Sequence, residues 1–168
     1  FDPSGGAGLL ADIKTFEQHR TYGFGVMTAN TWQNDTEVKE VEWVETAKIL
    51  KQMDVILDKF QVKGFKIGIT KDAEMLESIT KHIRQRSEKA FVVWDPVLKA
   101  SSGFGLFEKG NIEKPLSDVN LITPNKEEFE ILKARFKNQK NIEKYFAEDI
   151  EFFFMIYGSR FNRNSTFD

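Results

Sequence analysis

The chain has no cysteine among its 168 residues, which excludes a disulfide framework, a thiolate nucleophile and a cysteine-ligated metal site within this sequence. It also lacks an apolar run long enough to span a bilayer, and nothing laid out as a signal peptide precedes its first glycines. We therefore expect a cytoplasmic protein without a membrane partner. An excess of one charge is lacking too, because 24 Lys and Arg stand against 26 Asp and Glu, so net charge gives no reason to expect nucleic acid.

The length and the hydrophobic content of 40% are sufficient for one domain with a substantial core, and we expect a single domain over 1–168. Its glycine-rich opening is the most ligand-like loop of the chain. In α/β proteins such a loop follows a strand, and no strand precedes it here. We therefore expect that the domain is incomplete at this end.

Two kinds of segment alternate along the chain. Apolar residues recur three or four positions apart where helices are predicted, and short apolar runs bounded by turn residues predict buried strands. The expected helices are 9–16, 49–60, 75–83 and 127–135, and the expected strands are 23–29, 65–69, 90–94, 119–122 and 150–157. This alternation predicts an α/β fold, with an open, mostly parallel sheet flanked by helices.

Ligands of such sheets bind at the carboxyl ends of the strands. Polar and glycine-rich residues gather after the expected strands, at 30–36, 68–72, 95–105 and 123–128. The charged segment 133–144 is interpreted as a solvated helix and loop rather than a binding patch.

The opening segment Asp2-Pro3-Ser4-Gly5-Gly6-Ala7-Gly8 can turn sharply and approach a ligand closely, since glycine has no Cβ. Because a helix follows, its free N–H groups suit a polar or anionic ligand. The segment matches neither a Walker A loop nor the Gly-x-Gly-x-x-Gly pattern, and a plain tight turn is the alternative. Asp12 in the first helix could bind the same ligand or be a surface carboxylate favoured by the helix dipole.

Two further candidates stand at expected strand ends. Asp95 could be a Mg²⁺ or substrate carboxylate, or the residue that begins a turn before Pro96. Asn125 and Glu128 have the spacing of a capping box, and they could also help to hold hydrated Mg²⁺. The small-residue loop 100–105, which contains Ser101, could lie over phosphates.

Aromatic and amide side chains complete the candidates. Gln33 and Asn34 could recognise a heteroaromatic ring, because an amide offers both a donor and an acceptor. Trp32 could stack on such a ring, although a buried structural role is favoured. His19 and His82 lack metal-ligand spacing and are expected on helix surfaces.

Taken together, these segments resemble the hydroxymethylpyrimidine/phosphomethylpyrimidine kinases of thiamin biosynthesis, which belong to the ribokinase-like superfamily. The resemblance runs in order through about residues 2–132. The segments that carry it are Asp2-Pro3-Ser4-Gly5-Gly6-Ala7-Gly8-Leu9-Leu10-Ala11-Asp12-Ile13-Lys14-Thr15, Thr28-Ala29, Gln33-Asn34, Lys66-Ile67-Gly68, Asp95-Pro96-Val97, Ser101-Ser102-Gly103, Thr123-Pro124-Asn125 and Glu128.

The resemblance implies that ATP and Mg²⁺ are used to phosphorylate 4-amino-5-hydroxymethyl-2-methylpyrimidine and then its monophosphate. It implies that Asp12 and Gln33 bind the aminopyrimidine. The residues that it places around the ring are Gly6, Ala7, Gly68 and Ile69, where the family often has methionine instead of Ile69. It places Asn125, Glu128 and Ser101 near ATP phosphates, and Asp95 and Glu128 near the metal. Dimers are common in the family, so a homodimer is expected, although no apolar stripe in the sequence demands it.

The chain departs from the family pattern near its end. It reads Tyr157-Gly158-Ser159-Arg160 where the family has Lys-Gly-Gly-His, and the Gly-Thr-Gly-Cys anion hole has no counterpart before Asp168. The catalytic residue is therefore expected beyond Asp168, and this chain alone should transfer phosphate poorly. Two alternatives stay open: a pyridoxal kinase-like activity, and a truncated, non-catalytic pyrimidine-binding relative.

Overall fold

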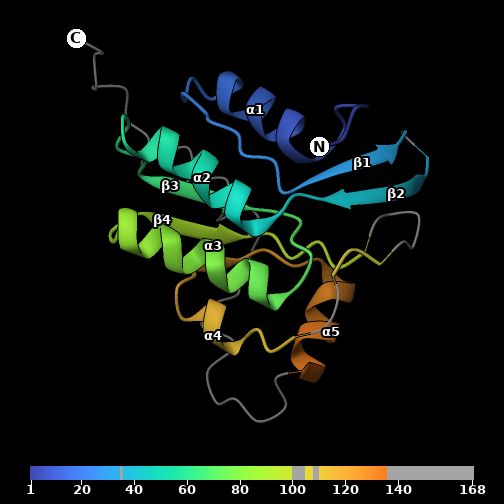
Figure 1. Cartoon of the computed structure of the whole chain (residues 1–168). Coiled ribbons are helices and arrows are strands. Elements are labelled where there is room, and N and C mark those ends of the chain that lie inside the picture. Colours follow the sequence, from blue (N-terminus) through green and yellow to red (C-terminus); the bar gives the residue numbers. More distant parts are fainter. Residues whose placement is uncertain (35, 100–104, 108–109, 136–168) are drawn as a thin grey trace.

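The computed structural model describes residues 1–34, 36–99, 105–107 and 110–135. Figure 1 shows a mixed α/β arrangement in which helices and strands largely alternate along the chain. The elements in order are α1 (Gly8–Gln18), β1 (Ala29–Gln33), β2 (Val38–Trp43), α2 (Thr46–Leu57), β3 (Gly64–Ile67), α3 (Ala73–Arg86), β4 (Phe91–Trp94), α4 (Glu113–Leu116), β5 (Leu121–Ile122) and α5 (Lys126–Arg135).

Strands β3, β4 and β5 form a parallel sheet in that order. In register, Ile67 pairs with Trp94, and Trp94 pairs with Ile122. The alignment continues past the strands, because the Asp95 N–H donates to the Ile67 carbonyl at 2.8 Å. The carboxyl ends of all three strands therefore meet at one edge, as the alternating pattern predicted.

Helices α2 and α3 pack against each other in front of this sheet (Figure 1). Helix α3 begins at a capped end, where the Met75 N–H donates to the Asp72 carboxylate at 2.8 Å. Its residues Leu76, Ile79 and Ile83, spaced by three and four, are buried on one face. They join a continuous core with α2, the sheet and α5, which holds the strand ends in place.

The strand expected at 23–29 is wrong, because only Ala29 of that run lies in a strand. The rest of the run passes over α1 instead. A Cβ at Gly23 would lie 2.4 Å from Phe16 Cδ2, and a Cβ at Gly25 would lie 2.3 Å from Leu9 Cδ1. The two glycines therefore allow the backbone to approach the helix, and the apolar run is covered by α1 rather than by neighbouring strands.

The missed element is an antiparallel ribbon. Strand β1 pairs with β2, from Ala29 opposite Trp43 to Gln33 opposite Val38, with a register shift after Trp32. This ribbon extends away from the parallel sheet in Figure 1. The short helix α4 (Glu113–Leu116) was not predicted from the sequence either.

Two other predictions concern segments that are not described or only partly described. The strand expected at 150–157 lies outside the described residues. Of the charged segment 133–144, only 133–135 are described; they form the end of α5, where Lys133 is exposed. Within the described ranges, none of the helices has both the length and the apolar content to cross a membrane.

Candidate functional site

The carboxylate of Asp2 organises the glycine-rich opening. It is 5% exposed and accepts hydrogen bonds from the Ser4 N–H at 2.8 Å, the Ser4 hydroxyl at 2.7 Å and the Ala7 N–H at 2.9 Å. Gly5 and Gly8 adopt φ of +70° and +58°, a region that disfavours other residues. Because the carboxylate binds backbone on both sides of Gly5, the loop has a defined conformation ahead of α1.

The same carboxylate connects the loop to β1. Gln33 donates a side-chain hydrogen bond to Asp2. Burial by itself would raise the pKa of Asp2, but the hydrogen bonds from Ser4, Gln33 and Ala7 outweigh burial and lower this pKa. Because an ionised carboxylate only accepts, the Gln33 amide nitrogen faces Asp2, and its oxygen is left as the acceptor for another group.

Lys66 forms ion pairs with two acidic residues of the candidate site. The Lys66 ammonium on β3 lies 2.7 Å from Asp12 Oδ1 on α1 and 3.3 Å from Asp95 Oδ2 after β4. The three side chains are only 28–31% exposed. Burial by itself lowers the pKa of Lys66, but the hydrogen bonds and charges of Asp12 and Asp95 outweigh burial and raise this pKa. The cluster therefore consists of two carboxylates around one ammonium group.

The end of β3 leaves open space beside this cluster. A Cβ on Gly68 would meet no atom of the described chain within 4 Å. The next residue is tied to the segment before β1, because the Thr28 hydroxyl donates to the Ile69 carbonyl at 2.7 Å. The structure thus brings Asp12, Gly68, Ile69 and Asp95 to one edge of the sheet.

Helix α5 starts with the capping box that the spacing predicted. The Glu128 N–H donates to Asn125 Oδ1 at 2.9 Å, and the Asn125 N–H donates to Glu128 Oε2 at 2.9 Å. Glu128 is 7% exposed, and its Oε1 accepts from the Leu98 N–H at 3.3 Å. Burial raises the pKa of Glu128, while these backbone hydrogen bonds oppose the rise.

The acidic residues at this edge limit the kind of metal that could bind. Within the described ranges, no group of three or more His, Asp or Glu side chains is placed to hold an ion. Asp95 is partly exposed and has Lys66 3.3 Å away, whereas both oxygens of Glu128 already accept backbone hydrogen bonds. Such a donor set fits a hydrated Mg²⁺ that takes phosphate oxygens as further ligands, which is a common arrangement for this ion.

Several expectations about single residues are corrected. Trp32 is 47% exposed on the antiparallel ribbon, so the structural prediction of a buried aromatic is wrong. His82 is not a free surface residue, because its Nε2 lies 3.0 Å from Asp54 on α2 and its side chain is 16% exposed. His19 is exposed, as expected. Ser101 lies outside the described residues.

Neither Asp2 nor Lys66 was predicted to have a role of its own. Asp2 carried a local signal, since an Asp two residues before a Ser is typical of a side-chain-capped turn. Lys66 carried a weaker one, a single lysine within the apolar run 65–69. Its two partners lie 54 and 29 positions away in the sequence, so only the tertiary structure identifies the bridge.

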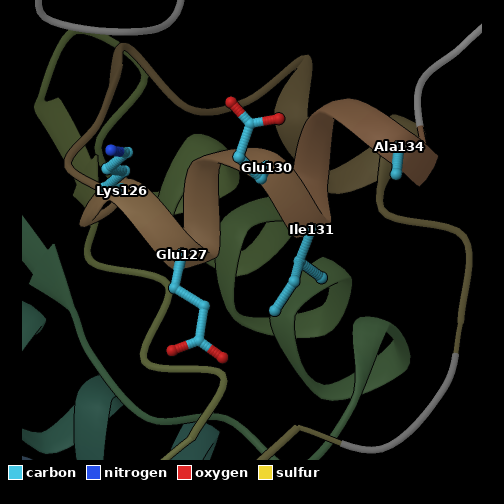
Figure 2. A pocket seen from close by; sticks show the side chains of 5 residues that line it. All are labelled: Lys126, Glu127, Glu130, Ile131 and Ala134. Carbon is cyan, nitrogen blue, oxygen red and sulfur yellow. The ribbon is translucent and has the colours of Figure 1, made fainter.

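An open hollow lies along α5 and is shown in Figure 2. Its lining residues are Lys126, Glu127, Glu130, Ile131 and Ala134. All of them come from one helix, and none is a predicted site residue. Glu127 is moreover engaged by Lys99 at 2.7 Å. The strand-end cluster, rather than this hollow, is therefore the candidate site.

A parallel sheet with polar residues at its carboxyl edge and a glycine-rich loop before the first helix defines an α/β protein whose ligands bind at the strand ends. Similarity to solved kinase structures places this fold in the ribokinase-like class. The family model described as phosphomethylpyrimidine kinase matches residues 2–153, and the chain belongs to this family.

Individual relatives agree with this assignment. The hydroxymethylpyrimidine/phosphomethylpyrimidine kinase of Aquifex aeolicus is 38% identical over 136 residues, which are 79% of this chain and 53% of the relative. A crystal structure of phosphomethylpyrimidine kinase from Clostridium difficile superposes with a TM-score of 0.68 at 30% identity, covering 86% of this chain and 63% of that one. Bacillus subtilis pyridoxal kinase, solved with ADP, gives 0.60 at 25% identity, covering 86% and 54%. The chain spans about half the length of the curated relatives it matches.

Proposed function

We propose that this chain supplies the substrate-binding part of a kinase that phosphorylates 4-amino-5-hydroxymethyl-2-methylpyrimidine, and then its monophosphate, with ATP and Mg²⁺ in thiamin biosynthesis. Membership of the phosphomethylpyrimidine kinase family supports the reaction. Three observations support the proposal: Asp2 holds the opening loop and Gln33 together, Lys66 joins Asp12 to the strand end at Asp95, and the space beside Gly68 is open. The cytoplasmic setting and a homodimer stay predictions.

The residues divide into two groups by their place in the site. Asp12 and Gln33 bind the aminopyrimidine, and Gly6, Ala7, Gly68 and Ile69 shape the space around its ring. Gln33 presents its amide oxygen, since its nitrogen is held by Asp2. An acceptor in this position suits the exocyclic amino group of the pyrimidine.

The second group serves the phosphates. Asp95 would hold hydrated Mg²⁺, with Glu128 acting through the water molecules of the ion, while Asn125 and Ser101 would lie near the ATP phosphates. When bound there, Mg²⁺ would supply positive charge that offsets the negative charge of the phosphates during transfer. In the first phosphorylation, the hydroxyl oxygen of the substrate forms a bond to the γ-phosphorus, the bond between that phosphorus and the leaving ADP breaks, and the hydroxyl proton passes to a base, which is the role of the catalytic residue. In the second, a phosphate oxygen of the monophosphate is the acceptor and ADP leaves in the same way. The catalytic residue is expected beyond Asp168.

Titration calorimetry of this chain with the hydroxymethylpyrimidine, with and without Mg-ATP, tests the proposal. We expect pyrimidine binding, and product analysis of the same mixture tests the expectation that this chain alone transfers phosphate poorly. Absence of pyrimidine binding would contradict the proposed pocket.

Pyridoxal kinase activity is the second candidate, supported by the structural similarity to the Bacillus subtilis enzyme. The same titration with pyridoxal separates the two. Tighter binding of pyridoxal than of the aminopyrimidine would favour the second candidate, because pyridoxal lacks the amino group from which the Gln33 oxygen is proposed to accept a hydrogen bond.

A further inference from the structure

Lys66 stands between the two halves of the candidate site. Its ammonium reaches Asp12 on the loop-helix side at 2.7 Å and Asp95 on the strand-end side at 3.3 Å. Within the described chain, no other ion pair to either carboxylate is present. One positive charge therefore serves two negative charges that belong to different subsites.

The strand register fixes this arrangement. Lys66 is held in β3 opposite Val93 of β4, and the Asp95 N–H is bonded to the Ile67 carbonyl at 2.8 Å. Asp95 and Lys66 thus have a rigid relation through the sheet. Asp12 lies on α1, of which no residue in the described helix is buried, so Lys66 is the polar contact that ties the Asp12 carboxylate to the sheet.

A divalent cation at Asp95 would meet the Lys66 ammonium as a competitor for the same carboxylate. Two positive charges near one carboxylate repel each other, and the effect is large where solvent is partly excluded. The ammonium consequently opposes cation binding at Asp95 while it supports the position of Asp12.

We propose that Lys66 is a positioning residue with opposite effects on the two subsites: it orients Asp12 for the aromatic substrate and weakens the binding of a divalent cation at Asp95. This inference rests on the proposed function for the roles of Asp12 and Asp95. It assigns to Lys66 the balance between substrate affinity and cation affinity.

Lys66→Met tests the inference, because it keeps the length and the apolar stem of the side chain and removes the charge. We expect hydroxymethylpyrimidine affinity, measured by calorimetry, to fall about tenfold as Asp12 loses its anchor. We expect Mn²⁺ affinity, measured from the free-ion paramagnetic resonance signal, to rise about tenfold as the competing charge disappears. Adding Asp95→Asn to Lys66→Met should remove the gain in Mn²⁺ affinity.

Two further variants serve as controls. Lys66→Arg keeps the charge and can bridge two carboxylates, so it should restore both affinities toward those of the unchanged chain. Lys81→Met removes the same charge from α3, where Lys81 pairs with Glu77 and is 59% exposed, and it should change neither affinity.

The inference requires that the pyrimidine affinity and the Mn²⁺ affinity of Lys66→Met change in opposite directions. A general loss of structure lowers both affinities, and equal or absent changes in Lys66→Met would overturn the inference. If the unchanged chain binds no pyrimidine, the proposed function fails and the assignment of Lys66 fails with it. If the unchanged chain binds pyrimidine and Lys66→Met binds it equally well, only the inference about Lys66 fails.

Discussion

The hydrogen bond between Gln33 and Asp2 gives the Gln33 amide a fixed direction. Gln33→Leu keeps a similar bulk and removes both amide groups, so a ligand amino group facing this position would be left unpaired. We expect pyrimidine affinity to fall by about 1–3 kcal/mol while ATP binding changes little. Calorimetry with each ligand measures both effects.

Gln52→Leu is the matched control, because the same amide is removed from an exposed position on α2, a helix that contributes no residue to the candidate site. It should leave pyrimidine affinity unchanged. An equal loss of pyrimidine and ATP binding in Gln33→Leu would indicate misfolding rather than a lost ligand contact.

Asp2 makes the stability of the opening loop depend on pH. Its pKa is lowered from the usual value of 3.8, because the hydrogen bonds to its ionised form outweigh burial. A carboxylate with a lowered pKa stabilises the fold above the usual value, and this contribution disappears as the pH falls below 3.8 through the folded-state pKa. Thermal unfolding between pH 7 and pH 2 should show the loss.

Asp2→Asn separates this contribution from general acid unfolding. The amide can accept with one oxygen only, so one of the N–H groups that Asp2 now accepts loses its partner. We expect a loss of about 1–3 kcal/mol at pH 7 and a smaller difference from the unchanged chain at low pH. A difference that stays constant over this pH range would contradict the assignment.

At the scale of elements, the sequence predicted the helices and strands whose burial follows from the spacing of their own apolar residues. Helix α3 and strand β4 were found because Leu76, Ile79 and Ile83 share one helix face and because 90–94 is continuously apolar. The run 23–29 looks the same locally. It differs because α1 covers it, and the contacts of Gly23 with Phe16 and of Gly25 with Leu9 depend on tertiary packing.

In the candidate site, too, local sequence predicted some features, and others depend on tertiary structure. Asp95 and Asn125 could be predicted because each follows a strand, and parallel strands end at one edge. The capping box of Asn125 with Glu128 followed from a spacing of three. The bridge through Lys66 could not be predicted, since nothing in the local sequence sets the distance between α1 and the end of β4.

Arg84 holds together the sheet edge opposite to the site. Its guanidinium donates to the carbonyls of Asp118, Glu88 and Ala90 and to Asn120 Oδ1, at 2.6–3.0 Å. These acceptors precede β4 and β5. Arg84→Lys cannot reproduce this fork, and we expect a loss of about 1.5–3 kcal/mol in the free energy of unfolding, measured in urea.

The control for Arg84→Lys is a substitution two residues further along α3. Arg86→Lys alters an exposed pairing with Asp58 and should change the free energy of unfolding by less than about 0.5 kcal/mol. Pyrimidine affinity of the folded Arg84→Lys protein should be unchanged, since the substitution lies at the other end of the strands. A loss of affinity without a loss of stability would contradict this placement.

At the scale of the whole molecule, the buried core is unevenly shared between the elements. Helix α3 contributes six buried residues, whereas none of the residues of α1, which is described throughout, is buried. The loop-helix side is held to the sheet by Lys66 and by the passage of Gly23 and Gly25 over α1. The proposed substrate-binding side is thus built on the less buried part of the described fold.

This unevenness predicts the order in which the molecule opens. Amide hydrogen exchange reports local opening, which needs less free energy where little apolar surface is buried. We expect the amides of α3 and β4 to exchange most slowly and those of α1 to exchange faster. Adding the hydroxymethylpyrimidine should slow exchange in α1 and leave α3 nearly unchanged, because the proposed site for this ligand includes the loop and Asp12 but not the buried face of α3. Exchange of α1 as slow as that of α3 without ligand, or equal slowing of both helices by ligand, would show that the two parts open as one unit and would contradict the prediction.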